Sequence, residues 1–544
     1  MKPLIRSHSA AGVLTAWFLI AACAAPDLGP VPENTSHLWG KDGERWRPAE
    51  RLPDFSHAGY RAGDEPIPKV PVVANVKDFG ATGDGVTDDS RAFLEAIKTT
   101  SNGAILIPAG RYLITRPLLI GKSNLVLRGE SRDSTVLYFP RTLKQAFKKG
   151  KDGGPTGWSW GGAWIWANPD LRRGDSNAPV WHRGERLAEV TKIALKGQTW
   201  IKVSDTRGIE PGQMVRLIQH ESDGSLALSM HAGHPLRGRC IIDTPGFQTI
   251  NWLLEVTRIE GKKVHFDRPL RLDVKPEWKA QLFEAVIEIE EVGIEHLTIE
   301  FPVRPYPGHH NEPGANAISL GHAYNSWVRD VAILNADNGI FFWYARYCTA
   351  QNVVIAGRAG HYGFNLGGAQ DSLVTRFRIE NRNIHDTSLS NMANGNVYSW
   401  GKGRNINFDH HRGAAFQNLS SRIHVGLPNR LWVSSATKTG HYTAAHETYW
   451  NIRPRAEIRR LETWPAQNII GRIGRSEKAR SDQLDRWLEH VDKLEPEDLH
   501  LAQWHRRTSR PMPKRPRFPK ALPEGLVTNT SVGGGVPPRD LARK

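Results

Sequence analysis

The sequence has few cysteines and no long hydrophobic run, and these two features exclude some classes of protein. Only three cysteines occur among 544 residues, which excludes a disulfide-stabilised small scaffold. Cys240 and Cys348 could pair in an oxidising compartment, although two separate buried thiols are the simpler interpretation. The one extended apolar stretch, residues 10–22, is shorter than the roughly 20 residues that span a bilayer. The composition therefore predicts one large soluble body.

Acidic residues are outnumbered, and the surplus of positive charge is concentrated at one end. The formal net charge is +16, and residues 501–544 carry ten Lys and Arg against two acids. This Pro-rich basic tail is typical of a solvated segment, or of one that contacts lipid headgroups or an anionic glycan. The sequence has no recognisable nucleic-acid-binding motif, so we expect no nucleic-acid partner.

The first 22 residues have the pattern of an export signal. Lys2 and Arg6 precede the apolar run, and small residues end it at Cys23. Ile20-Ala21-Ala22-Cys23 resembles a bacterial lipobox, which implies that Cys23 is lipidated and becomes the mature N-terminus. The alternative is an ordinary secretory signal cut nearby. Either interpretation predicts an exported protein, in the periplasm or at the outer membrane and cell surface.

Residues 76–112 hold the most informative local pattern. A strand ends in the glycine-rich turn of residues 80–85, where positive φ costs little. Thr87 is a plausible helix N-cap, with Asp88 and Asp89 in the first turn. An amphipathic helix over residues 90–99 follows, and then two short β-rich runs separated by Pro108. A capped helix between strands suits the closed end of a β-solenoid, so capping and turn formation account for these aspartates.

This segment closely resembles the opening of the pectate-lyase-like right-handed β-helix superfamily, over roughly residues 70–140. That superfamily includes polysaccharide lyases, glycoside hydrolases, alginate epimerases and phage tailspikes. The resemblance implies the fold but leaves the chemistry open.

Regularly spaced apolar triplets predict the rest of the fold. Triplets that begin at Val331, Val353, Phe377 and Ile406 are separated by 22, 24 and 29 residues, the spacing of stacked coils. We therefore expect an all-β protein, a single-stranded right-handed parallel β-helix with an inserted small β-subdomain and a C-terminal irregular or helical extension. The expected segments are a lipoprotein-type signal peptide (1–22), an N-terminal tether (23–69), the cap and first coils (70–140), a Trp-rich loop with the inserted subdomain (141–284), the main coils with the groove (285–454), a C-terminal packing segment (455–510) and a disordered basic tail (511–544).

Histidines mark the region where function is expected. Ten of the 22 histidines lie between residues 301 and 450. His309 and His310 occupy a loop that could bind substrate or simply be a polar surface. Gln370 and Asp371 close a Gly-rich coil, where Asp371 is either catalytic or a turn residue.

The strongest pattern is Asp409-His410-His411-Arg412, directly after a strand. Four consecutive ionisable residues at a strand end are costly unless they are solvated or used. A second polar cluster follows at coil-like spacing, so it is expected to stack beside the first. The candidate catalytic residues are Asp409, His410, His411, Arg412, Asp371 and Glu447, and the candidate substrate contacts are His309, His310, Gln370, His441, Tyr442 and His446.

Two reactions on a polysaccharide fit these residue types. In β-elimination, His411 or His410 would remove the proton α to a uronate carboxylate, Arg412 would clamp that carboxylate, and Tyr442 or the other histidine would protonate the leaving oxygen. In hydrolysis, two carboxylates would flank the glycosidic oxygen. The richness in His and Arg favours a lyase that acts on a uronic-acid-containing glycan.

Some family features are absent, and a third function stays open. The paired-aspartate and Gly-His-Gly signatures of polygalacturonase-type hydrolases do not occur in the coils, and no acidic calcium cluster is evident. We expect no obligatory cofactor, with calcium dependence left open. The expected partners are a polysaccharide and the membrane, through the lipid anchor. The third alternative is a non-catalytic glycan-binding lipoprotein whose tryptophans in 158–181 stack on sugar rings.

Overall fold

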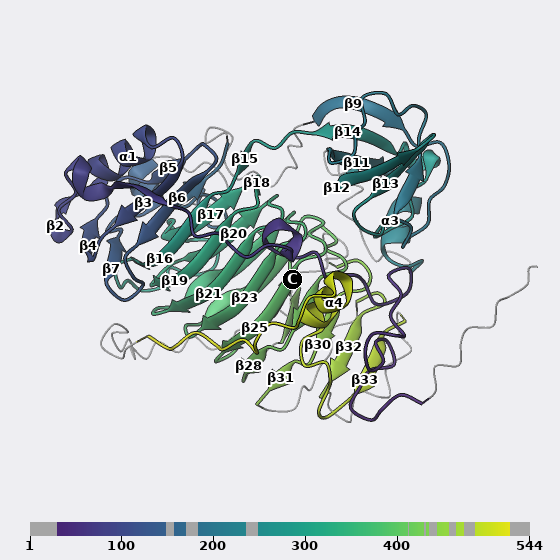
Figure 1. Ribbon diagram of the computed structural model, residues 1–544. Helices are drawn as coiled ribbons and strands as arrows, with labels where there is room; N and C mark the ends of the chain where they lie inside the picture. The colour runs from purple at the N-terminus through teal and green to yellow at the C-terminus, as the bar shows by residue number, and fades with distance from the viewer. Residues whose placement is uncertain are drawn as a thin grey trace, which may run out of the picture.

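The computed structural model describes residues 30–147, 157–169, 183–234, 249–411, 413–428, 431–434, 443–455, 464–472 and 485–522. Along most of this length the chain winds into parallel coils that stack strand on strand (Figure 1). The predicted fold class is confirmed: the protein is a right-handed parallel β-helix with an inserted β-subdomain. None of the helices in the described ranges is long and apolar enough to cross a membrane.

The N-terminal end of the solenoid is closed by helix α1 (Ser90–Thr99), as predicted. Thr87, however, is not its N-cap, because strand β2 (Asp84–Asp88) continues past it and Asp89 is the residue that precedes the helix. The aspartates have the predicted structural roles. Asp89 accepts hydrogen bonds from the backbone of Thr82 (2.6 Å) and Gly83 (3.1 Å), and Asp88 accepts one from Ser90 N (3.1 Å). These carboxylates satisfy backbone N–H groups at the turn and at the helix start.

The larger parallel sheet runs the length of the solenoid. The coils stack in chain order, each strand pairing in register with the strand of the next coil. Its strands are β1 (Val72–Asn75), β2, β3 (Gly103–Ile107), β4 (Gly110–Leu113), β6 (Leu125–Gly129), β7 (Thr135–Tyr138), β16 (Gly293–Glu300), β19 (Trp327–Leu334), β21 (Thr349–Ala356), β23 (Leu373–Ile379), β25 (Val397–Gly403), β27 (Leu419–Ser421), β28 (His424–Gly426), β30 (Thr448–Trp450), β31 (Arg453–Pro454), β32 (Asn468–Gly471) and β33 (Trp487–His490).

A second parallel sheet of eight strands forms another face of the same coils, and we call it the short sheet. It consists of β5 (Leu118–Ile120), β8 (Ile165–Ala167), β17 (Asn316–Gly321), β20 (Asn338–Trp343), β22 (Gly360–Gly367), β24 (Asn383–Ser390), β26 (Phe408–His410) and β29 (Trp432–Ser434). β8 comes from the region expected to be a Trp-rich loop and an insert, yet it pairs with β5 and β17. Part of that region therefore belongs to the solenoid.

The inserted subdomain is antiparallel and stands beside the solenoid (Figure 1). Its strands are β9 (Arg183–Glu189), β10 (Trp200–Lys202), β11 (Met214–His220), β12 (Thr249–Glu260), β13 (Lys263–Phe266) and β14 (Gln281–Ala285), with helix α3 (Ser225–Met230). Its core includes solenoid residues such as Met392 and Phe416, so the insert packs on the turns of the coils. The two-residue strands β15 (Ile289–Glu290) and β18 (Ala323–Tyr324) follow it.

The C-terminal region departs from the expected plan in two ways. The parallel ladder does not end near residue 454, because β32 and β33 add further rungs to it. Helix α4 (Leu499–Thr508) then packs back on the coils through buried Leu499. Residues 511–522 were expected to be disordered, but Phe518 lies against Trp400 at 6.0 Å between ring centroids, and Leu522 is buried. The remaining short helical segments are α2 (Leu143–Phe147), η1 (Tyr60–Gly63), η2 (Val76–Phe79) and η4 (Pro276–Trp278).

Along each strand of the short sheet, side chains alternate between an inner row, which points into the solenoid, and an outer row, which points away from it. Phe342, Leu366 and Leu389 are in register and belong to the apolar core of the solenoid. The residues just before them (Phe341, Asn365 and Ser388) form the outer row, because successive side chains of a strand point to opposite faces. Asp409 extends the outer row and His410 the inner one.

Candidate functional site

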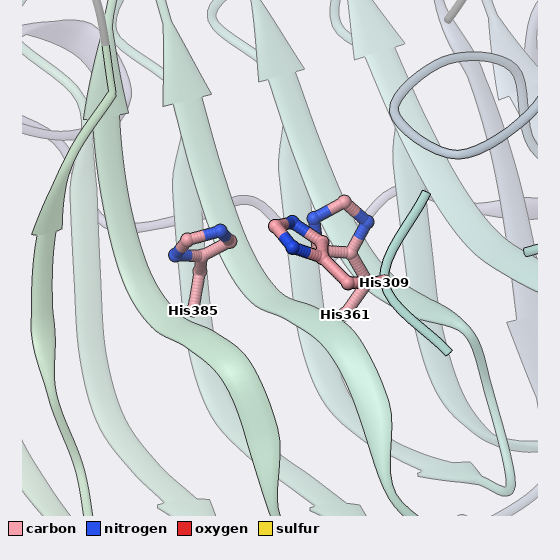
Figure 2. Close-up of side chains that lie close together, drawn as sticks. All are labelled: His309, His361 and His385. Atoms are coloured by element: carbon pink, nitrogen blue, oxygen red, sulfur yellow. The ribbon is translucent and has the colours of Figure 1, made fainter. Parts of the chain in front are cut away.

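Imidazoles from three parts of the chain gather over the outer face of the short sheet. His361 is the second residue of β22, His385 lies in β24, and His309 comes from the loop before β17. Figure 2 shows the three rings grouped together. The ring centroid of His309 lies 4.8 Å from that of His361 and 5.5 Å from that of His385. We call these three residues, with His310, His411 and Asp409, the histidine cluster.

Asp409 is the carboxylate of the cluster. It is fully buried in the outer row, where one oxygen lies 3.1 Å from Nδ1 of His385 and the other accepts a 2.6 Å hydrogen bond from the Ser388 hydroxyl. Burial alone would raise the pKa of this carboxyl, but His385, His411 and Ser388 stabilise its anion and lower the pKa to about 2. Asp409 is therefore a fixed negative charge beside His385.

The loop of residues 306–312 covers one side of the cluster. His310 packs against His309 at 3.8 Å between ring centroids and edge-on against Trp160 at 5.3 Å. Glu312 is buried, accepts a hydrogen bond from the Tyr306 hydroxyl and lies 3.3 Å from His361 Nδ1. His309 is exposed, so the loop leaves the cluster connected to solvent.

The predicted Asp-His-His-Arg motif does not face one groove as a unit. Asp409 points outward, and His411 joins the outer side, with its ring 5.4 Å from that of His385. His410 points into the solenoid, 1% exposed, with its ring 4.3 Å from Trp464 and its Nε2 3.1 Å from Glu447. The strand continues to residue 410, so neighbouring side chains must alternate. His410 and Glu447 therefore form a buried internal pair away from the cluster, and the hypothesis of an outward-facing motif was wrong for both.

Asp371 and Gln370 connect the insert to the solenoid. Asp371 is fully buried among three guanidinium groups, 3.0 Å from Arg268 and 3.3 Å from Arg346 and in contact with Arg271. Burial would raise its pKa, but the three arginines lower it. Gln370 donates a 2.9 Å hydrogen bond to Asn251 O in the insert. The structure thus gives both residues anchoring contacts and places neither in the histidine cluster.

The remaining predicted residues lie elsewhere. His446 is in a turn near the insert, where burial and the positive charge of Lys196 lower its pKa well below the usual value. Cys348 is a buried free thiol. Cys23, Cys240, Arg412, His441 and Tyr442 lie outside the described residues.

The tryptophans expected to stack on sugar are core residues. Trp158, Trp164 and Trp166 are at most 1% exposed and belong to the apolar core of the solenoid. Trp160 contacts the histidine cluster through His310. Trp181 lies outside the described residues.

Sequence reasoning missed His361 and His385. His361, His385 and Asp409 are separated by 24 residues each, one coil length. A search for chemically active residues at the coil period, instead of for runs of adjacent ones, would have found them. The predicted residues His309, His310 and His411 do meet there.

The structure also contains a basic groove of about 670 Å³. It lies at the turns that lead from the larger sheet to the short sheet. Arg382 precedes His385 by three residues, which corresponds to about 10 Å of extended chain. Its charged lining consists of Arg378, Arg382, Lys402, Arg404, Arg455 and Glu380.

Two sets of residues in the cluster could hold a metal ion. The ligand atoms of His309, His361 and His385 lie within 4.8 Å of one another. The same holds for His385, Asp409 and His411. Both sets share His385, and both offer nitrogen-rich coordination of the kind that transition metals take.

Comparison with known proteins places the opening of the solenoid in a family. Residues 73–177 match the model of the family described as rhamnogalacturonase A/epimerase, pectate lyase-like. The chain is 37% identical over 106 residues to a glucan 1,3-beta-glucosidase of Cochliobolus carbonum, which covers 17% of this chain and 13% of that protein. It is also 38% identical over 72 residues to alginate lyase 7 of Azotobacter vinelandii, and this match covers 12% of this chain and 8% of that protein. The chain thus matches only a small part of these curated relatives.

Among solved structures, the chain is similar to the Gp54 tailspike of Acinetobacter baumannii bacteriophage AP22, solved in complex with a capsular saccharide. The sequence identity is 11%, the TM-score is 0.42, and the match covers 74% of this chain and 61% of the tailspike. This degree of similarity says nothing about the reaction. The family match is thus confined to the opening of the solenoid, and the stacked parallel coils that follow continue the same fold, which supports a pectate-lyase-like parallel β-helix superfamily.

Proposed function

We propose that the protein is a carbohydrate-active enzyme that cleaves an acidic polysaccharide by β-elimination at the histidine cluster. The observation that carries the proposal is the gathering of imidazoles beside the buried anion of Asp409 on the outer face of the short sheet. An imidazole titrates near neutral pH and therefore suits proton abstraction. The names of the curated relatives, which include a lyase and a glucosidase, agree with carbohydrate chemistry.

His411 is the proposed base. It is half-buried at the end of β26, and its backbone N–H donates a 2.8 Å hydrogen bond to Leu389 O, which holds the residue at the sheet. Its imidazole would take the proton α to the uronate carboxylate. The electron pair left behind forms a carbon–carbon double bond as the glycosidic C–O bond breaks, and a second imidazole protonates the leaving oxygen.

The basic groove supports an anionic substrate. Five cationic side chains and one carboxylate line it, so its field favours carboxylate-bearing sugars. Arginine guanidinium groups also bind carboxylates in a bidentate manner. A polymer that extends from the cluster into this groove would place several uronates along the arginines.

The test is turnover of a panel of uronic-acid and neutral polysaccharides. Elimination raises ultraviolet absorbance, because it creates an unsaturated uronate. We expect His411→Ala to lower kcat roughly 10²-fold or more, the size of a lost general base. The matched control is His296→Ala, which removes a partly exposed histidine of the larger sheet, paired with Asp330.

The other outcomes separate the alternatives. New reducing ends without the absorbance would establish hydrolysis, and retention of the polymer without either signal would establish a binding protein. Full activity in His411→Ala would refute this residue as the base.

A further inference from the structure

We infer that His309, His361 and His385 form a binding site for one divalent transition-metal ion of the zinc class. The inference goes beyond the proposed β-elimination, since it concerns what the imidazoles bind and holds whichever reaction the cluster performs. Its basis is the orientation of the two buried rings.

Each of the two strand histidines has a buried ring nitrogen without a hydrogen-bond partner. Nδ1 of His361 lies 2.9 Å from the backbone oxygen of Ser159, and its Nε2 has no hydrogen-bond partner. Both ring nitrogens of His385 are buried without a hydrogen bond, although Nδ1 lies 3.1 Å from the carboxylate of Asp409. His361 therefore has the arrangement of a metal-binding histidine, in which an acceptor on one nitrogen fixes the ring and directs the other nitrogen to the ion.

Leaving these nitrogens without a partner is expensive. A buried polar atom without a hydrogen bond has lost its hydration with nothing to compensate for it. His361 and His385 lie in adjacent coils, and a ring nitrogen of each lies within 4.8 Å of the other and of a ring nitrogen of exposed His309 (Figure 2). A bound cation would satisfy all three nitrogens at once.

The distances suit a site that needs little adjustment. The three ligand atoms lie within 4.8 Å of one another. Tetrahedral zinc with Zn–N bonds of about 2.0–2.1 Å separates its nitrogens by about 3.4 Å. Two of the ligands sit on strands, and the third is on a loop, which can close the remaining distance. Three protein ligands leave a fourth position open for water or substrate.

The test measures metal content. Chelator-treated full-length protein is incubated with Zn²⁺ or with Co²⁺, dialysed and analysed for bound metal, with the visible spectrum of Co²⁺ as a second readout. We expect about one ion per chain and a tetrahedral Co²⁺ spectrum. His361→Ala and His385→Ala should lose the ion, and His309→Ala should weaken retention at least tenfold. His309→Ala is the safer variant, because its side chain is exposed and folding does not depend on it.

His411→Ala and His296→Ala are the controls, and both should keep the ion. Absence of stoichiometric metal in the unmodified protein would overturn the inference. Loss of the ion in His411→Ala with full retention in His309→Ala would also overturn it, because the ligands would then be the set with Asp409. These readouts do not measure activity, so the metal-binding inference can hold even if the β-elimination assay fails.

Discussion

At the scale of single residues, the register of the strands determines which predicted site residues meet. Asp409 and His411 reached the outer face, whereas His410 turned inward to Glu447. The sequence showed four adjacent ionisable groups, and period-two alternation allowed either pair to be the outer one. What decided the matter was the register with β24, which places Asp409 beside Ser388. That register depends on the whole stack and cannot be read from the motif.

The arginine cage around Asp371 predicts a large stability effect at one position. We expect Asp371→Asn to lower the free energy of unfolding by about 3–5 kcal/mol, because it leaves three buried guanidinium groups without their shared counter-charge. Urea unfolding followed by tryptophan fluorescence would measure the loss. Asp205→Asn, on the exposed surface of the insert, is the control and should change little. A loss below about 1 kcal/mol at Asp371 would contradict the importance of the cage.

At the scale of elements, the strands and the cap helix could be predicted more reliably than the ends of the solenoid. Helix α1 lies where its pattern placed it, and the triplets that begin at Val331, Val353 and Phe377 pair in register in the larger sheet. The triplet at Ile406 was assigned wrongly, because Phe377 pairs with Gly401 and residues 406–408 lead into β26 of the short sheet. The extra rungs β32 and β33 were missed, because Trp487 and Leu488 read equally well as a helix face. The packing of the tail near Phe518 was not predicted, because the tail has few apolar residues. Phe518 nevertheless packs against Trp400.

Helix α4 should make stability depend on pH through its cap. Asp498 accepts hydrogen bonds from Trp400 Nε1 (2.6 Å) and the Ser421 hydroxyl (2.9 Å), but its burial is the larger effect and raises its pKa to about 6. In the unfolded chain the pKa is about 3.9. As pH rises from about 4 to 6, the unfolded state loses this proton first, so stability falls by up to about 3 kcal/mol and then levels off.

The matched variant is Asp498→Asn, which keeps the cap but cannot titrate. Its stability relative to the unmodified protein should rise between pH 4 and pH 7 by about the same amount, as measured by urea midpoints at both pH values. A difference that stays constant with pH would mean that Asp498 titrates normally in the folded protein.

At the scale of the whole molecule, the two parallel sheets place the histidine cluster and the basic groove within a few residues of each other. The groove could not be foreseen from composition. Much of the positive surplus lies in the tail, whereas the groove is formed by Arg382, Arg404 and their neighbours on successive coils. Only stacking brings these charges together.

Reversing charge in the groove should weaken binding of an acidic polysaccharide. We expect Arg382→Glu combined with Arg404→Glu to raise KM at least tenfold with a smaller change in kcat, because the groove binds the polymer away from the reacting bond. The effect should shrink as salt is added, since ions screen exposed charges. Arg207→Glu, on the exposed surface of the insert, is the control. An unchanged KM at low salt would exclude the groove as a substrate contact.

The position of residues 36–55, in the segment expected to be an N-terminal tether, also has a consequence for how the protein folds during synthesis. Residues 36–55 pack on the last coils, where the Ser36 hydroxyl donates a 2.6 Å hydrogen bond to Glu489 and Trp39 shares a core with Leu494. A ribosome reaches Glu489 453 residues after Ser36, which takes roughly 20–90 s at about 5–20 residues per second. Residues 36–55 are thus synthesised well before the coils that they cover, and the last coil stays uncovered until they pack on it.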